Sequence, residues 1–140
     1  MAPLAFPGSV FQPSPDMTKP MALLLHEKLM PGSQLVSRFE ERDYRVATVS
    51  DPGQLAAAAL QHQPMLVVAD LTSRRGDVLA AIRDLRATEA TLHVPVLAYT
   101  LHEDEKVREA ATQAGVTVLA TDATIIPHLD HFIEHALRLD

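Results

Sequence analysis

The sequence predicts an α/β domain of the flavodoxin-like (βα)5 type, in which a five-stranded parallel sheet carries helices on both faces. From residue 20 onward, short apolar runs alternate with amphipathic stretches. The runs are continuously apolar, as in strands that are buried on both faces of a parallel sheet. Strict alternation of strand and helix implies right-handed crossovers and a doubly wound sheet. The length of 140 residues fits one such domain.

The composition narrows the classes of function. A net charge of −6 argues against a basic, phosphate-binding face, so nucleic acid is not an expected partner. The absence of cysteine excludes a disulfide framework, a thiolate zinc site and a cysteine nucleophile. No apolar stretch approaches the roughly 20 residues of a membrane helix, and the start of the chain lacks the basic region of a signal peptide. We therefore expect a cytoplasmic protein that does not bind membranes.

Two regions are expected along the chain. Residues 1–19 contain four of the ten prolines, and proline resists both helices and central strands. This segment is predicted to be a flexible, proline-rich arm. Residues 20–140 are predicted to form the folded domain.

The apolar runs that predict the strands are each about five or six residues long, which is the usual strand length. They are Met21–Leu25, Tyr44–Val49, Met65–Ala69, Val94–Tyr99 and Val116–Ala120.

Helix signals fill the segments between these runs. Asp51 followed by a proline is an N-cap with proline at the first helical position, and it opens the second helix. Asp77 can cap the third helix, and Gly115 can end the fourth, over residues 103–114, because glycine enters the left-handed region cheaply. The last helix is expected over residues 124–138. The main inward positions are Leu35, Val36, Phe39, Leu55, Ala59, Leu60, Val78, Ile82, Leu85, Val107, Ala110, Ala111, Ala114, Ile126, Leu129, Phe132, Ile133 and Ala136.

Polar residues follow the strands at the edge where such folds bind ligands, beyond the carboxyl ends. The first strand ends in His26 and Glu27, the third in Asp70, the fourth in Thr100 and the fifth near Asp122. Because the first and third strands flank the central crevice, we expect Glu27 and Asp70 to face each other, with Thr100 nearby.

These segments resemble the receiver domain of two-component signalling over residues 20–138, in an atypical or pseudo-receiver form of the chemotaxis-receiver kind. Receivers carry acids after the first strand, an aspartate ending the third, a Ser/Thr ending the fourth and a lysine ending the fifth. PMLVVADL matches the strand that leads to the aspartate, and VPVLAYT matches the strand that leads to the hydroxyl. AGVTVLATDA matches the turn and strand that usually end in lysine-proline.

The resemblance implies that Asp70 accepts a phosphoryl group from a histidine kinase or phosphotransfer protein and that the hydroxyl of Thr100 senses it. It implies Mg²⁺ held by Glu27 and Asp70, no other cofactor, and no enzymatic activity beyond self-phosphorylation from a phosphodonor. Tyr99 stands where receivers often place a residue whose orientation tracks activation; packing in the core is the alternative.

The sequence departs from the receiver pattern in three places. His26 replaces one of the acids, and an imidazole is a poor ligand for Mg²⁺. Asp122 stands at the lysine position, and an anion beside a phosphate is unfavourable. The loop after Asp70 lacks the usual proline and glycine, and its Arg74 and Arg75 either supply positive charge or are solvated.

Three functions therefore stay open. The chain is a stand-alone atypical receiver that uses Asp70, a phosphorylation-independent adaptor with the same fold, or a small flavodoxin-like ligand-binding protein or enzyme. In the first two cases the signal leaves by contact with a signalling protein or a second copy. The expected surface is the face of the fourth helix, fifth strand and fifth helix that the resembling receivers use.

Three histidines of the last helix have positions that could suggest a metal site. His131 and His135 have the i, i+4 spacing of zinc ligands, and His128 lies on the same arc. That arc faces away from the apolar stripe, so we expect a solvated surface instead. The chain also lacks a nucleophile–base–orienter triad and a glycine-rich phosphate loop.

Overall fold

The computed structural model describes residues 19–73 and 76–138. Five parallel strands form one sheet in the order β2-β1-β3-β4-β5, which confirms the predicted fold class. Most of the predicted arm, and Arg74 and Arg75, lie outside the described residues. Within them, no helix is long and apolar enough to cross a membrane.

The strands are β1 Met21–Leu25, β2 Arg45–Val49, β3 Leu66–Asp70, β4 Val96–Thr100 and β5 Val118–Thr121. The helices are α1 Gly32–Glu41, α2 Leu55–His62, α3 Val78–Ala87, α4 Glu105–Ala114 and α5 Leu129–Arg138, with a short 3-10 helix, η3, at Pro52–Gln54.

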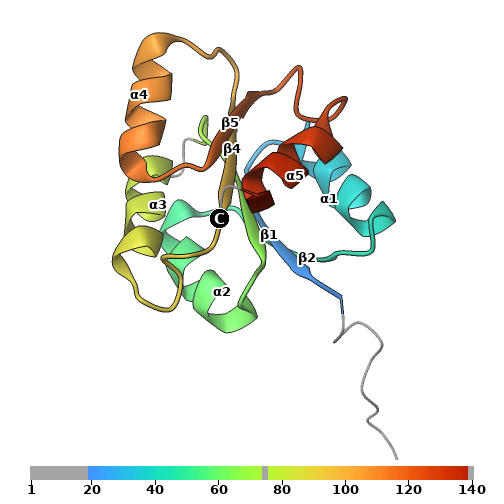
Figure 1. The fold of residues 1–140 in the computed structure, drawn as a ribbon, viewed down its shortest axis with the longest axis horizontal. Helices are drawn as coiled ribbons and strands as arrows, with labels where there is room; N and C mark the ends of the chain where they lie inside the picture. Colours follow the sequence, from blue (N-terminus) through green and yellow to red (C-terminus); the bar gives the residue numbers. More distant parts are fainter. Residues whose placement is uncertain (1–18, 74–75, 139–140) are drawn as a thin grey trace, which may run out of the picture.

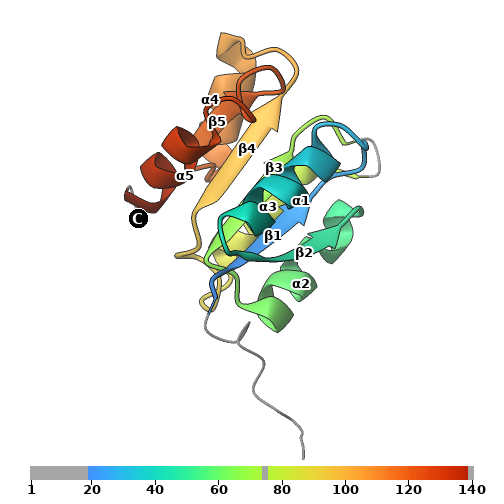
Figure 2. The ribbon, with the colours of Figure 1, turned by 90° about the vertical axis from the view of Figure 1, so that its right-hand side faces the viewer.

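Helices cover both faces of the sheet, with α2, α3 and α4 on one side and α1 and α5 on the other (Figure 1). Each face has its own apolar core, because alternate residues of a strand point to opposite faces. Leu23 and Leu25 of β1 pack on the α2–α3 side, whereas Ala22 and Leu24 pack on the side of α1 and α5. The strands point to the same edge, as the arrowheads of β1 and β4 show in Figure 2. The order of strands reverses between β1 and β3, which places the central crevice there.

The predicted helix signals at Asp77 and Gly115 act as expected, and Asp51 caps the 3-10 helix η3 that leads into α2 rather than α2 itself. The carboxylate of Asp51 accepts a hydrogen bond from the N–H of Gly53 at 2.9 Å, and that of Asp77 accepts one from Ala80 at 3.0 Å. Gly115 ends α4 with a φ of 105°, a left-handed conformation that favours glycine.

Two details of the helices differ from the sequence prediction. The last helix begins at Leu129 rather than near residue 124, because a turn held by Thr121 and Thr124 precedes it. Pro127 lacks an N–H group, so regular helical hydrogen bonding starts only after it. Leu60 of α2 was expected to face inward, but half of its surface is exposed.

Arg86 is a structural feature that the sequence did not reveal. Its guanidinium donates hydrogen bonds to the carbonyls of Leu92 and Val94, each at 2.7 Å, and to that of Gly115 at 3.0 Å. These bonds tie α3 to the segment that enters β4 and to the turn before β5. Arg86 therefore satisfies carbonyl groups that connecting segments would otherwise leave without partners.

Candidate functional site

Asp70 is the last residue of β3, and its side chain is completely buried at the carboxyl edge of the sheet. One oxygen, Oδ1, accepts hydrogen bonds from the N–H of Thr72 at 2.8 Å and from the Thr72 hydroxyl at 2.6 Å. The other oxygen, Oδ2, accepts no hydrogen bond from the described residues and lies 3.7 Å from Nζ of Lys28. A buried carboxylate needs such partners, because burial without them is unfavourable.

Lys28, in the loop after β1, reaches across the crevice to a second carboxylate. Its Nζ donates a hydrogen bond to Oδ2 of Asp122 at 3.1 Å, and Asp122 directly follows β5. The Lys28 side chain is 40% exposed and that of Asp122 is 21% exposed. We refer to Lys28, Asp70 and Asp122 as the Lys28 cluster. The site thus contains a lysine, but it comes from the loop after β1 and not from the end of β5.

Lys28 was not among the predicted site residues, because the strand ends alone do not point to it. Lys28 stands three residues beyond β1, and its reach depends on the path of the β1–α1 loop. The available signal was a lysine next to Glu27, on the same edge as two predicted acids.

Glu27 and His26 make contacts within the loops around the site. Oε1 of Glu27 accepts a hydrogen bond from the hydroxyl of Ser73 at 3.3 Å, and the Glu27 side chain is exposed. Nδ1 of His26 lies 3.2 Å from the carbonyl oxygen of Lys28. That Glu27 faces Asp70 across the crevice stays a prediction.

Asp70 and Tyr99 are register partners on neighbouring strands, so their side chains start from the same face of the sheet. The Tyr99 side chain packs in the core beside α1 and α5, and its hydroxyl is buried without a described hydrogen-bond partner. Burial first, and then the negative charges of Asp70 and Asp122, raise the pKa of Tyr99. Tyr99 therefore remains a neutral phenol that forms one wall beside the Lys28 cluster.

Thr100 follows Tyr99 and faces the other side of the sheet. It is buried, and it lines a groove of about 340 Å³ together with Leu71, Leu79, Val107 and other residues of α4. The described hydrogen bonds do not join its hydroxyl to Asp70. The structure therefore places Asp70 with Lys28 and Asp122, and places Thr100 in a neighbouring groove.

The Mg²⁺ site predicted at Glu27 and Asp70 uses only two carboxylates and stays a prediction. Within the described residues, no group of three or more His, Asp or Glu side chains could hold a metal ion. His128, His131 and His135 are exposed, as expected, and the rings of His131 and His135 stack with their centroids 6.1 Å apart.

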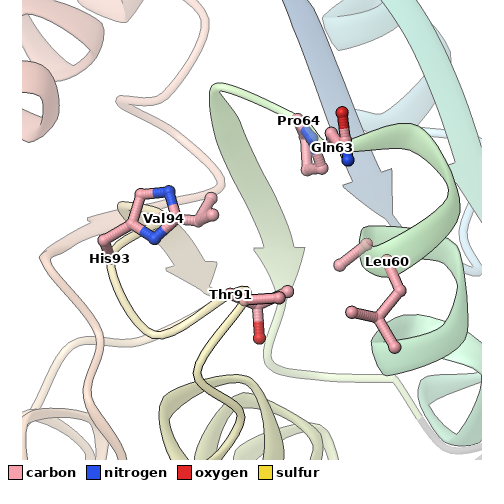
Figure 3. A pocket seen from close by; sticks show the side chains of 8 residues that line it. Leu60, Gln63, Pro64, Thr91, His93 and Val94 are labelled. Carbon is pink, nitrogen blue, oxygen red and sulfur yellow. The ribbon is translucent and has the colours of Figure 1, made fainter.

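A separate hollow lies at the opposite edge of the sheet. It has a volume of about 360 Å³ and is formed where α2 leads into β3 and α3 leads into β4. Figure 3 shows Leu60, Gln63, Pro64 and His93 around it. It lies at the amino ends of these strands, away from Asp70.

Solved structures of response regulators have a fold similar to that of this chain. The chain is similar to the BeF3-activated receiver domain of Klebsiella pneumoniae RstA, with 16% identity over 84% of this chain and 98% of that chain, and a TM-score of 0.75. It is similar to the Vibrio cholerae chemotaxis response regulator CheY4, with 14% identity over 82% of this chain and 99% of that chain, and a TM-score of 0.71. The Mn²⁺-bound response regulator Rcp1 matches with 19% identity over 84% of this chain and 89% of that chain, and a TM-score of 0.62.

The chain therefore has the fold of response-regulator receiver domains, which confirms the resemblance seen in the sequence. No protein-family model matches the sequence, and no curated protein matches it closely.

Proposed function

We propose that this chain is an atypical receiver-type signalling domain that acts through protein contacts and does not depend on phosphorylation of Asp70. The observation that carries the proposal is the position of the Lys28 ammonium group, 3.7 Å from Asp70 and 3.1 Å from Asp122. The ammonium group of Lys28 therefore already neutralises part of the negative charge of the two carboxylates from within the chain.

The surroundings of Asp70 disfavour a phosphorylated state. Oδ1 is occupied by Thr72, so a phosphoryl group would have to form on Oδ2. A phosphoryl group there would approach the carboxylate of Asp122 and compete with it for Lys28. Two unit charges of the same sign 4 Å apart repel by about 4 kcal/mol at the effective dielectric constant of a protein surface.

The expected contact surface consists of α4, β5 and α5 (Figure 1). β5 is an edge strand, because it pairs with β4 on one side only. Val118 and Leu119 on this strand are half-buried. They line a hollow of about 270 Å³, together with side chains that include Arg108 of α4 and His135 of α5. An unpaired edge with apolar side chains favours association with a partner protein or a second copy. The absence of cysteine suits a reducing compartment, so we place this activity in the cytoplasm.

A second candidate function is phosphotransfer to Asp70 from a histidine kinase or phosphotransfer protein. It is favoured by Oδ2 of Asp70, which accepts no described hydrogen bond and has a cation within reach. In that reaction Oδ2 would form a bond to phosphorus while the bond from phosphorus to the donor breaks.

Acyl-phosphate labelling separates the two functions. The chain and its Asp70→Asn variant are incubated with acetyl phosphate and Mg²⁺, and their intact masses are recorded beside a receiver that labels fully. Phosphorylation-independent action predicts no adduct on either protein. An adduct on the parent chain that Asp70→Asn abolishes would replace this function with phosphotransfer.

A further inference from the structure

The Lys28 cluster also determines which cations this site accepts. We propose that Lys28 is the resident cation of the site, that its ammonium group takes the place of a divalent metal ion between Asp70 and Asp122, and that removing it creates a metal site. The inference deepens the proposed function: its consequence for signalling rests on that function, whereas the claim about metal binding does not.

The first support is the positive charge that Lys28 already brings to the two carboxylates. Two carboxylates, one of them fully buried, lie on either side of one ammonium group. A divalent ion added to this arrangement would meet a positive charge that already lies within 4 Å of both carboxylates. Like charges at this separation repel strongly in a partly buried site.

The second support is space. Mg²⁺ binds oxygen ligands at about 2.1 Å in near-octahedral geometry and usually keeps several waters. An ion bound to Oδ2 of both Asp70 and Asp122 would lie beside two oxygens that Nζ of Lys28 already approaches at 3.7 and 3.1 Å. The ammonium and the metal ion therefore exclude each other.

The third support is the engagement of the neighbouring side chains. Glu27 accepts a hydrogen bond from Ser73, and Nδ1 of His26 lies next to the carbonyl of its own loop. The His26 ring also packs against Gly32, where an added Cβ would lie 2.2 Å from Nδ1. His26 therefore has little room to turn toward the cluster. The residues present do not fit a resident Mg²⁺ ion.

The same geometry contains the elements of a latent metal site. Oδ2 of Asp70 and Oδ1 of Asp122 are buried and accept no hydrogen bond from the described residues. Without Lys28, two carboxylates would face each other with free lone pairs, and such a pair attracts a hard divalent cation. The ammonium group is what separates this site from a metal site.

Binding of Mn²⁺ tests the proposal directly. Free Mn²⁺ is followed by electron paramagnetic resonance near neutral pH for the parent chain, Asp70→Asn, Lys28→Met, Lys28→Arg and the double variant Lys28→Met/Asp70→Asn. Lys106→Met, on the nearby start of α4, removes a lysine charge without touching the cluster and serves as the matched control. Circular dichroism without metal establishes that each variant is folded.

We expect Lys28→Met to bind Mn²⁺ at least about tenfold more tightly than the parent chain, since the repulsion removed exceeds one tenfold step in affinity. Lys28→Arg, Lys106→Met and the double variant should bind as poorly as the parent. Two results would overturn the proposal: Mn²⁺ binding to the parent chain that Asp70→Asn abolishes, or a folded Lys28→Met variant that gains no affinity. The parent measurement decides the first point even if Lys28→Met does not fold.

This test is independent of phosphorylation. A chain that labels with acetyl phosphate but binds no Mn²⁺ would refute the proposed function and leave the role of Lys28 intact. A chain that does not label but binds Mn²⁺ through Asp70 would refute the role of Lys28 and leave the proposed function intact.

Discussion

Nζ of Lys28 and Oδ2 of Asp122 lie 3.1 Å apart, although β3 and β4 separate the strands that these residues follow. Receivers that the sequence resembles carry acids after the first strand and a lysine after the fifth. In this chain Lys28 follows His26 and Glu27 in the loop after the first strand, and Asp122 stands where a lysine would follow the fifth strand. The site therefore contains a lysine, but on the opposite side of the crevice.

Exchanging the charges of Lys28 and Asp122 provides the first prediction. Lys28→Asp gathers acids around Asp70, and Asp122→Lys leaves two lysines together. Each should therefore lower the free energy of unfolding by about 1–2 kcal/mol, because the pair is partly exposed. The double exchange should recover at least half of the summed loss. Urea denaturation of the four proteins measures this coupling; simple addition of the two losses would show that the ion pair contributes nothing.

Thr72 provides the second prediction. Its hydroxyl donates a hydrogen bond of 2.6 Å to the buried carboxylate of Asp70. Thr72→Val keeps the shape of the side chain but removes this donor, and we expect a loss of about 1.5–3 kcal/mol, typical of a hydrogen bond to a charged group. Thr72→Ser keeps the hydroxyl and should lose less than half as much. A Thr72→Val variant as stable as the parent would show that this hydrogen bond contributes nothing.

Gly115 provides the third prediction. It holds a φ of 105°, and an added Cβ would lie 2.6 Å from the side chain of Arg86. Gly115→Ala should therefore destabilise the domain by more than about 1 kcal/mol. Gly53→Ala is the matched control, because its Cβ would lie 3.4 Å or more from its neighbours and its φ is not left-handed. Thermal melts should rank Gly115→Ala well below the parent, with Gly53→Ala close to it.

The structure explains which parts of the fold could be predicted. Asp51 and Asp77 were identified as caps because an N-cap contact spans only a few residues of sequence. The strands were found because burial on both faces leaves continuous apolar runs. The start of α5 was placed too early, because the turn at Thr121 and Thr124 and the helix share the same apolar spacing. Only the hydrogen-bond pattern distinguishes them.

The site was predicted less completely, for a geometrical reason. Asp70 and Asp122 could be placed because Asp70 ends β3 and Asp122 directly follows β5. The reach of Lys28 depends on how the β1–α1 loop crosses the ends of two strands that lie elsewhere in the sequence. The sequence could in principle have predicted which side of the sheet Thr100 faces. Side chains alternate along β4, and Tyr99 is the register partner of Asp70, so Thr100 faces the opposite side.

An ion pair between α1 and α5 provides the fourth prediction. The Arg42 guanidinium bonds to both carboxylate oxygens of Asp130, and these hydrogen bonds hold the pKa of that carboxyl below its usual value of 3.8. A lowered folded-state pKa adds stability that is present above the unfolded-state pKa and lost as the pH falls through the folded-state pKa.

Asp130→Asn should consequently be less stable than the parent at neutral pH and equally stable well below pH 3.8. Added salt should reduce the difference at neutral pH, because the pair is exposed. Denaturation midpoints across this pH range measure the effect. A difference that persists at low pH would mean that Asp130 acts through something other than its charge.

The last prediction concerns the edge formed by α4, β5 and α5. Leu119 is half-buried on the edge strand β5, where an approaching protein would contact it. If this edge mediates self-association, the chain should form dimers as its concentration rises, and Leu119→Arg should shift the equilibrium at least about tenfold toward monomer by placing a charge in the contact. Leu60→Arg places the same charge on a leucine that is 50% exposed on α2, and it should leave association unchanged. Sedimentation velocity over a concentration series distinguishes the cases. Dimers that survive Leu119→Arg but not Leu60→Arg would move the contact to the α2 side, and a chain that stays monomeric at every concentration would leave β5 to a different protein partner.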